Sequence, residues 1–131
     1  MEEALIARLL GLEAVSGLVA TRVYPGSRPQ GSALPAIVLN RISGGPLYAD
    51  DGEVGLEQAR IQIDCWADTY TAAKKLARAV TASLSAFEGT IGTKAFEFIE
   101  LDIERDLQEG GSDAATYPFR TSLDFLCMAK R

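Results

Sequence analysis

The sequence contains no histidine, and this absence excludes more chemistry than any other feature of the composition. Without histidine there is no Ser-His or Cys-His nucleophile pair, no imidazole general base, and no ligand of the type most often bound to zinc. An enzyme built on this chain would have to work with carboxylates, lysines or tyrosines alone.

Cysteine is scarce as well, because Cys65 and Cys127 are the only two in the chain. Each lies in an apolar, strand-like stretch, so we expect two reduced thiols buried in a core. The sequence leaves a disulfide between them open, since that bond would require their two strands to be neighbours.

The chain also lacks a basic excess and a long apolar run. Thirteen Lys and Arg against eighteen Asp and Glu give a formal net charge of −5, which argues against a surface that grips nucleic-acid phosphates. No stretch has the apolar length of a membrane span, and the N-terminal residues begin with two acids instead of a basic region. We therefore expect neither a secretion signal nor a membrane partner.

The clearest pattern runs from Glu57 to Phe87 and predicts one strand followed directly by one helix. Apolar and polar residues alternate from Ala59 to Cys65, which is typical of a strand with one face on a core. The period then becomes helical, with Asp68 expected as the N-cap and Gly89 as a left-handed C-terminal cap. The residues expected to face the core are Ala59, Ile61, Ile63 and Cys65 on the strand and Ala73, Leu76, Ala77, Val80, Leu84 and Phe87 on the helix.

The remaining segments complete a small set of α and β elements. Glu2–Val19 predicts a helix that Gly11 and the Ser16-Gly17 pair interrupt. Further segments are an extended piece at Thr21–Tyr24, a loop at Ser27–Pro35, strands at Ala36–Ser43, Ala95–Asp106 and Tyr117–Met128, and a flexible connection at Gln108–Thr116. We expect residues 1–131 to form a single α+β domain of two layers, with a mostly antiparallel sheet of four to five strands and helices packed on one face.

An acidic run in the predicted strand Ala95–Asp106 is the first candidate for chemistry. On a regular strand Glu100, Asp102 and Glu104 share one face at steps of about 7 Å, which is too wide for one Mg²⁺ or Ca²⁺ ion. Arg60 and Arg120 are expected on the same face and offer salt-bridge partners. We therefore favour an ion-paired, solvated sheet face over a metal site.

The stretch between the two hairpin strands is the second candidate. Ala36–Ser43 is expected to end at Gly44-Gly45-Pro46 and to pair with Leu56–Trp66, with a second turn signal at Asp51-Gly52. The acids around this turn lack the ligand spacing of a calcium loop. The apolar residues stranded in this arm either fold back onto their own domain or contact a partner, and they are Leu47, Tyr48 and Val54.

Several stretches, taken in order and spacing, resemble the tail completion, or tail terminator, proteins of long-tailed bacteriophages and prophages. The resemblance covers about Leu5 to Cys127. It is strongest at Arg22-Val23-Tyr24-Pro25, at Leu34-Pro35, at Gln62-Ile63-Asp64 and at Glu104-Arg105-Asp106. It is weakest in the segments 44–53 and 110–116, where such proteins differ most.

The residues offer no catalytic, cofactor or metal constellation, and the resemblance implies a structural virion protein. Such a protein would form a ring, typically a hexamer, that caps the tail tube, ends tail polymerisation and joins the tail to the head-completion or connector protein. DNA would pass through without being read, and assembly would take place in the bacterial host cytoplasm. The expected contacts with another subunit or with the major tail tube protein are Ser43, Gly44, Gly45, Pro46, Leu47, Tyr48, Ala49, Asp50, Asp51, Gly52, Glu53 and Val54.

Three other functions remain open on the residues alone. A head-tail joining, or stopper, protein is the nearest alternative within virion assembly. A small-molecule-binding regulatory α+β domain predicts a concave pocket with convergent polar groups. A carboxylate-based hydrolase predicts metal-dependent turnover that is lost on changing Asp102 or Glu104.

Overall fold

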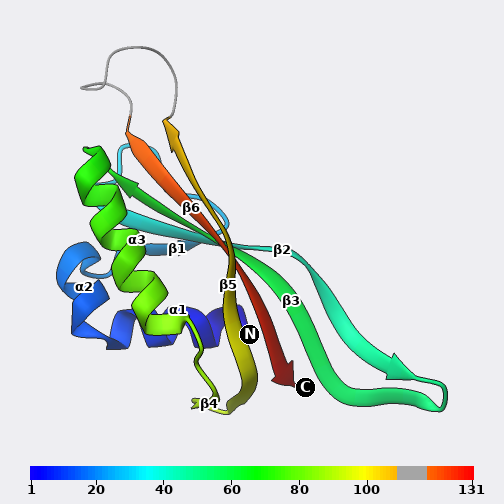
Figure 1. The fold of residues 1–131 in the computed structure, drawn as a ribbon. Helices are drawn as coiled ribbons and strands as arrows, with labels where there is room; N and C mark the ends of the chain where they lie inside the picture. The colour runs from blue at the N-terminus through cyan, green and yellow to red at the C-terminus, as the bar shows by residue number, and fades with distance from the viewer. Residues whose placement is uncertain (109–117) are drawn as a thin grey trace.

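The computed structural model describes residues 1–108 and 118–131, and it shows three helices on one side of a strongly twisted sheet (Figure 1). The predicted flexible connection lies almost wholly outside the described residues. The elements are α1 (Glu2–Gly11), α2 (Glu13–Val19), β1 (Val23–Pro25), β2 (Ala36–Ala49), β3 (Gly52–Ala67), α3 (Tyr70–Leu84), β4 (Gly89–Ile91), β5 (Lys94–Gln108) and β6 (Phe119–Lys130).

The sheet has six strands in the order β1-β2-β3-β6-β5-β4 and is mixed. The α+β prediction with helices on one face is confirmed, and the sheet is mostly antiparallel as predicted, but it has six strands instead of four to five. The sheet gains β4, which had no period of its own, and β1 pairs with β2 in parallel. A parallel neighbour needs a long connection, and the predicted loop Ser27–Pro35 supplies it.

The predicted strand–helix unit is confirmed, and its ends are corrected. Thr69, not Asp68, is the N-cap of α3, because its hydroxyl accepts the Ala72 amide at 3.1 Å. The helix ends at Leu84, and the left-handed residue after it is Ala86, whose amide donates to the Ile99 carbonyl at 2.8 Å. Gly89, predicted as the cap, instead begins β4.

The N-terminal helical segment breaks once, at Leu12, whose extended backbone separates α1 from α2. Gly11 is the last residue of α1, as its low helix propensity allows. The Ser16-Gly17 pair lies inside α2 and does not interrupt that helix. None of the helices described here has the length and apolar character needed to span a bilayer.

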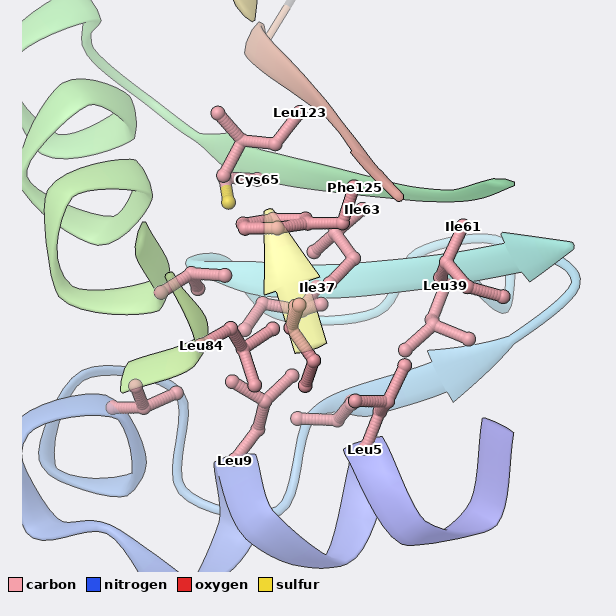
Figure 2. Packing of buried hydrophobic residues seen from close by; sticks show 14 of the residues in the cluster. Leu5, Leu9, Ile37, Leu39, Ile61, Ile63, Cys65, Leu84, Leu123 and Phe125 are labelled. Atoms are coloured by element: carbon pink, nitrogen blue, oxygen red, sulfur yellow. The ribbon is translucent and has the colours of Figure 1, made fainter. Parts of the chain in front are cut away.

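The core lies between the helices and the sheet face that they cover. Figure 2 shows Leu5 and Leu9 of α1 extending toward Ile37 and Leu39 of β2. The predicted stripe is buried from Ala73 to Leu84, whereas Phe87 lies beyond the end of α3 and is half-buried. Leu76, Val80 and Leu84 alone contribute roughly 5–9 kcal/mol before entropy. An isolated helix of this length is marginal in water, so α3 depends mainly on this burial.

Both cysteines are free and buried, as predicted. Their strands β3 and β6 are neighbours, but Cys65 lies opposite Thr121 and Cys127 lies opposite Ala59. The two thiols are therefore separated by about 20 Å along the strands, well beyond the reach of a disulfide. Burial raises the pKa of Cys127 to about 12 and also raises the pKa of Cys65, so both thiols stay protonated.

Candidate interaction surface

The segment Ser43–Val54, here called the arm, is a β-hairpin and not the loop expected from its glycines. Strand β2 continues through Gly44-Gly45-Pro46 to Ala49, and Asp50-Asp51 forms the turn to β3. The predicted pairing of Ala36–Ser43 with the strand ending at Trp66 is confirmed, and the ladder continues beyond the predicted end to Ala49 opposite Gly52. Because register shifts near Ile42 and Leu47 bend the ladder, the arm extends away from the helices (Figure 1).

Gly44, at the base of the arm, lets β2 approach β3 closely. Its φ is +146°, and a Cβ on it would lie 2.5 Å from the Gln58 carbonyl oxygen and 2.7 Å from the Ala59 Cα. Both obstacles are backbone atoms, so no side chain can be accommodated by a small shift. The glycine that seemed to end the strand instead allows it to continue with a bend.

Charged contacts hold the arm at its base and again near its turn. At the base, Glu57 opposite Pro46 pairs with Lys94 of β5 at 2.9 Å. Nearer the turn, Glu53 opposite Tyr48 pairs with Arg131, the residue after β6, at 3.0 Å. The Arg131 amide also donates to the Gly55 carbonyl at 3.0 Å. The hydrogen bond from Lys94 lowers the pKa of Glu57, which keeps this carboxylate ionised.

Beyond this base the arm exposes apolar side chains to solvent. Tyr48 is 71% exposed and Val54 is 48% exposed, whereas Leu47 is half-buried. The first two residues therefore do not fold back onto the core. Exposed apolar side chains on a projecting hairpin are typical of an interaction surface.

A hollow of about 360 Å³ lies at the base of the arm on the sheet face away from the helices. Its lining is partly apolar, from Pro46, Phe98 and Leu126. Arg60, a charged group in the lining, is already bound to Asp102 at 2.7 Å and Asp124 at 3.3 Å. With that guanidinium occupied, the hollow offers apolar contact area more than the convergent polar groups of a metabolite site.

The acidic strand is irregular, and this overturns the prediction that Glu100, Asp102 and Glu104 share one face. A register shift between Leu101 and Ile103 leaves Asp102 as an extra residue. Glu100 lies opposite Leu126 on the outer face, whereas Glu104 lies opposite Leu123 on the helix face. Among residues 1–108 and 118–131 there is no group of three or more side chains able to hold a metal ion.

The predicted ion-paired sheet face is confirmed and is more buried than expected. Asp64 and Asp124 are 4% and 6% exposed, and arginines neutralise both. Arg120 lies 3.6 Å from Asp64, while Arg60 and Arg105 each lie 3.3 Å from Asp124. Buried carboxylates with such partners have a structural explanation and need no catalytic one.

A second polar cluster lies on the helix face of β5 and was missed from the sequence. Lys74 of α3 contacts Glu104 at 3.4 Å and Asp106 at 3.2 Å, and the Tyr70 hydroxyl donates to Asp106 at 3.1 Å. Burial alone would raise the pKa of Asp106, but the hydrogen bonds from Lys74 and Tyr70 outweigh it and lower that pKa. The signal in the sequence was the helical spacing that places Lys74 and Tyr70 on one side of α3.

A solved structure shares this fold. A chain of the "Virion of native gene transfer agent (GTA) particle" is 18% identical, with a TM-score of 0.76, and the match covers 100% of our chain and 95% of that chain. No curated protein sequence gave a significant match to the chain.

A family model assigns the chain more specifically. The model described as "Tail completion protein gp17" matches residues 3–127. This match defines the class as structural proteins of phage-like virion tails, a class of assembly proteins and not of enzymes. The chain belongs to the tail completion protein gp17 family, so the resemblance noted in the sequence is confirmed.

Proposed function

We propose that the chain forms a ring, of six subunits by the family resemblance, that caps the tail tube and ends its polymerisation. The same ring would join the tail to the head-completion or connector protein. Membership of a tail completion family supports a position in the tail. A heterologous interface that closes on itself gives a ring, and a ring with one tube-like face leaves no edge for further tube subunits.

The observation that carries this proposal is the arm. It projects from the sheet, it is held by Lys94 at its base and by Arg131 near its turn, and it exposes Tyr48 and Val54. A stiff hairpin with apolar side chains near its tip suits docking to another subunit or to the tube protein. Its residues Ser43–Val54 stay our candidates for these contacts.

The charge of the chain is compatible with DNA passing through such a ring. The formal net charge is −5, and a wall of like charge repels phosphates and lets the genome slide without being bound. The proposal also requires residues 1–131 to act as one domain, which the single core shared by all three helices supports.

Complementation of a tail-assembly system that lacks its own tail completion protein tests the function. We expect Tyr48→Asp, and a deletion of residues 45–53, to give folded protein and tails of uncontrolled length in electron micrographs. The control is Thr93→Asp, which places the same charge on an exposed turn between β4 and β5. Tails of normal length with Tyr48→Asp and with the deletion would contradict the role of the arm.

The same micrographs separate the stopper alternative. A protein that only joins heads to tails would leave tail length normal when it is absent and would give unattached heads and tails. Tails that overgrow without the chain, and stop when it is restored, support capping of the tube.

A further inference from the structure

The sheet has two long open edges, one on each side. On the outer edge of β2, β1 pairs only with Ile37–Leu39, and no other described strand covers Asn40–Ala49. On the outer edge of β5, β4 pairs only with Lys94–Phe96, and the Ala86 amide reaches Ile99. Within the described residues no further backbone hydrogen bond reaches that edge between Glu100 and Leu107.

The backbone groups along these edges point outward, ready to pair. The Ile99 carbonyl accepts from outside the sheet, and alternate residues of a strand direct their backbone groups to the same side, so Leu101 directs its N–H and C=O outward too. The same argument holds on β2, because the Leu39 carbonyl accepts the Gly26 amide at 3.0 Å and Arg41 is two residues further along. Each edge is therefore a template for another strand.

Both edges also carry exposed apolar side chains. Ile42 and Tyr48 of β2 are 52% and 71% exposed, and Ile103 and Leu107 of β5 are each 40% exposed. At the rise of a strand, each open edge is about 25–35 Å long. Long apolar edges of this kind are normally covered in a finished assembly, because uncovered ones aggregate.

Charge disfavours one of the possible pairings between these edges. Strand β5 carries five acids, at positions 97, 100, 102, 104 and 106, against only Lys94 and Arg105, whereas β2 carries Arg41 and no acid. Pairing β5 with a second β5 would place two acid-rich strands side by side, and like charges on facing strands destabilise a pair. Pairing β5 with β2 brings no such repulsion.

We propose that the β2 edge of one copy of this chain pairs with the β5 edge of the next, so that one sheet continues from subunit to subunit. This inference rests on the proposed ring and identifies its interface. The contact is head-to-tail, since each copy uses a different edge toward each neighbour, and such contacts close into rings. Pro46 has no N–H to donate, so it divides the β2 edge into two short pairing segments.

Two edge variants and their mixture test the pairing by analytical ultracentrifugation and native mass spectrometry. Ile42→Lys blocks the β2 edge, and Ile103→Lys with Leu107→Lys blocks the β5 edge. We expect each variant alone to be monomeric where the unmodified chain assembles, with association at least tenfold weaker. Mixed in equal amounts, they should form a heterodimer through the one intact pair of edges, and nothing larger.

The control is Ala82→Lys, which adds the same charge on the exposed side of α3 and should assemble like the unmodified chain. If the lysine variants of β5 unfold, Ile103→Thr with Leu107→Thr removes apolar area while keeping strand propensity. The threonine variant should also assemble more weakly than the unmodified chain, as expected for the lysine variant.

The outcomes separate the interface from the ring. If the unmodified chain never self-associates, alone or on tail tube ends, the ring itself is wrong and the interface falls with it. If the unmodified chain and both edge variants form the same rings, the ring stands and the edge pairing is wrong. A mixture that gives no heterodimer would likewise overturn the head-to-tail contact.

Discussion

Gly44 illustrates how one residue shapes the arm. Its backbone lies in a region that L side chains rarely adopt, and the Gln58 carbonyl occupies the space of a Cβ. At Gly45, its neighbour, a Cβ would meet no atom within 4 Å, and the backbone has no positive φ. Two adjacent glycines therefore have different roles, which their identity alone does not reveal.

We expect Gly44→Ala to lower the free energy of unfolding by roughly 1–3 kcal/mol, because the strand must shift or strain to admit the methyl group. Gly45→Ala is the matched control and should leave stability unchanged or raise it by up to about 1 kcal/mol. Urea denaturation followed by circular dichroism measures both. Equal stabilities for the two variants would show that the close approach of β2 to β3 at Gly44 does not constrain the arm.

At the scale of elements, the sequence was most informative where one period ran for many residues. The alternation from Ala59 to Cys65 and the helical stripe from Ala73 to Leu84 both predicted the buried residues correctly. Short elements such as β1 and β4 have three residues each and carry no readable period. Their pairing depends on contacts between distant segments, which a local pattern does not contain.

The predictions for β5 and for the N-cap of α3 were wrong for a different reason. Two plausible caps, Asp68 and Thr69, stand side by side, and the choice depends on where the first helical turn begins. Similarly, a regular strand and a strand with one extra residue at Asp102 have the same composition. The segment Ser43–Val54 was expected to project and it does, but Gly44 and Pro46 hid the continuation of β2 through it, and its contacts with a partner stay a prediction.

The N-cap gives the prediction at this scale. Thr69→Ala removes the oxygen that accepts the Ala72 amide, and we expect it to lower the free energy of unfolding by about 1 kcal/mol. Asp68→Ala should change it by less than about 0.5 kcal/mol, because an exposed residue outside the helix is altered. Thermal unfolding of both variants compares them. A larger loss for Asp68→Ala than for Thr69→Ala would reverse our assignment.

At the scale of the whole molecule, paired carboxylates connect elements that are far apart in the sequence. Glu2 of α1 bonds to Arg41 of β2, and Glu57 of β3 bonds to Lys94 of β5. The hydrogen bond from Lys94 lowers the pKa of Glu57. For Glu2 burial acts in the opposite direction, but contacts with Arg41 outweigh it and that pKa is lowered too.

These shifts predict a loss of stability in acid. A carboxylate whose pKa is lower in the folded state stabilises the fold fully above its unfolded value, near pH 4.5, and the stabilisation is lost as pH falls through the lowered pKa. Glu57→Gln should cost about 1 kcal/mol at pH 7 and shrink the acid loss. Lys94→Met should have the same two effects. The double variant should lose little more unfolding free energy than either single variant, because each already breaks the pair. Unfolding free energies between pH 2 and 7 measure this, and an unchanged acid loss in both variants would contradict it.

The extra residue at Asp102 has a consequence for anyone comparing diverged members of this family. It reverses the parity of β5, so that inward positions are odd-numbered at Ile99 and Leu101 but even-numbered at Glu104 and Asp106. An alignment or mutational scan that assumes one parity throughout would assign half of the strand to the wrong side. The two halves of β5 are therefore better aligned as separate blocks.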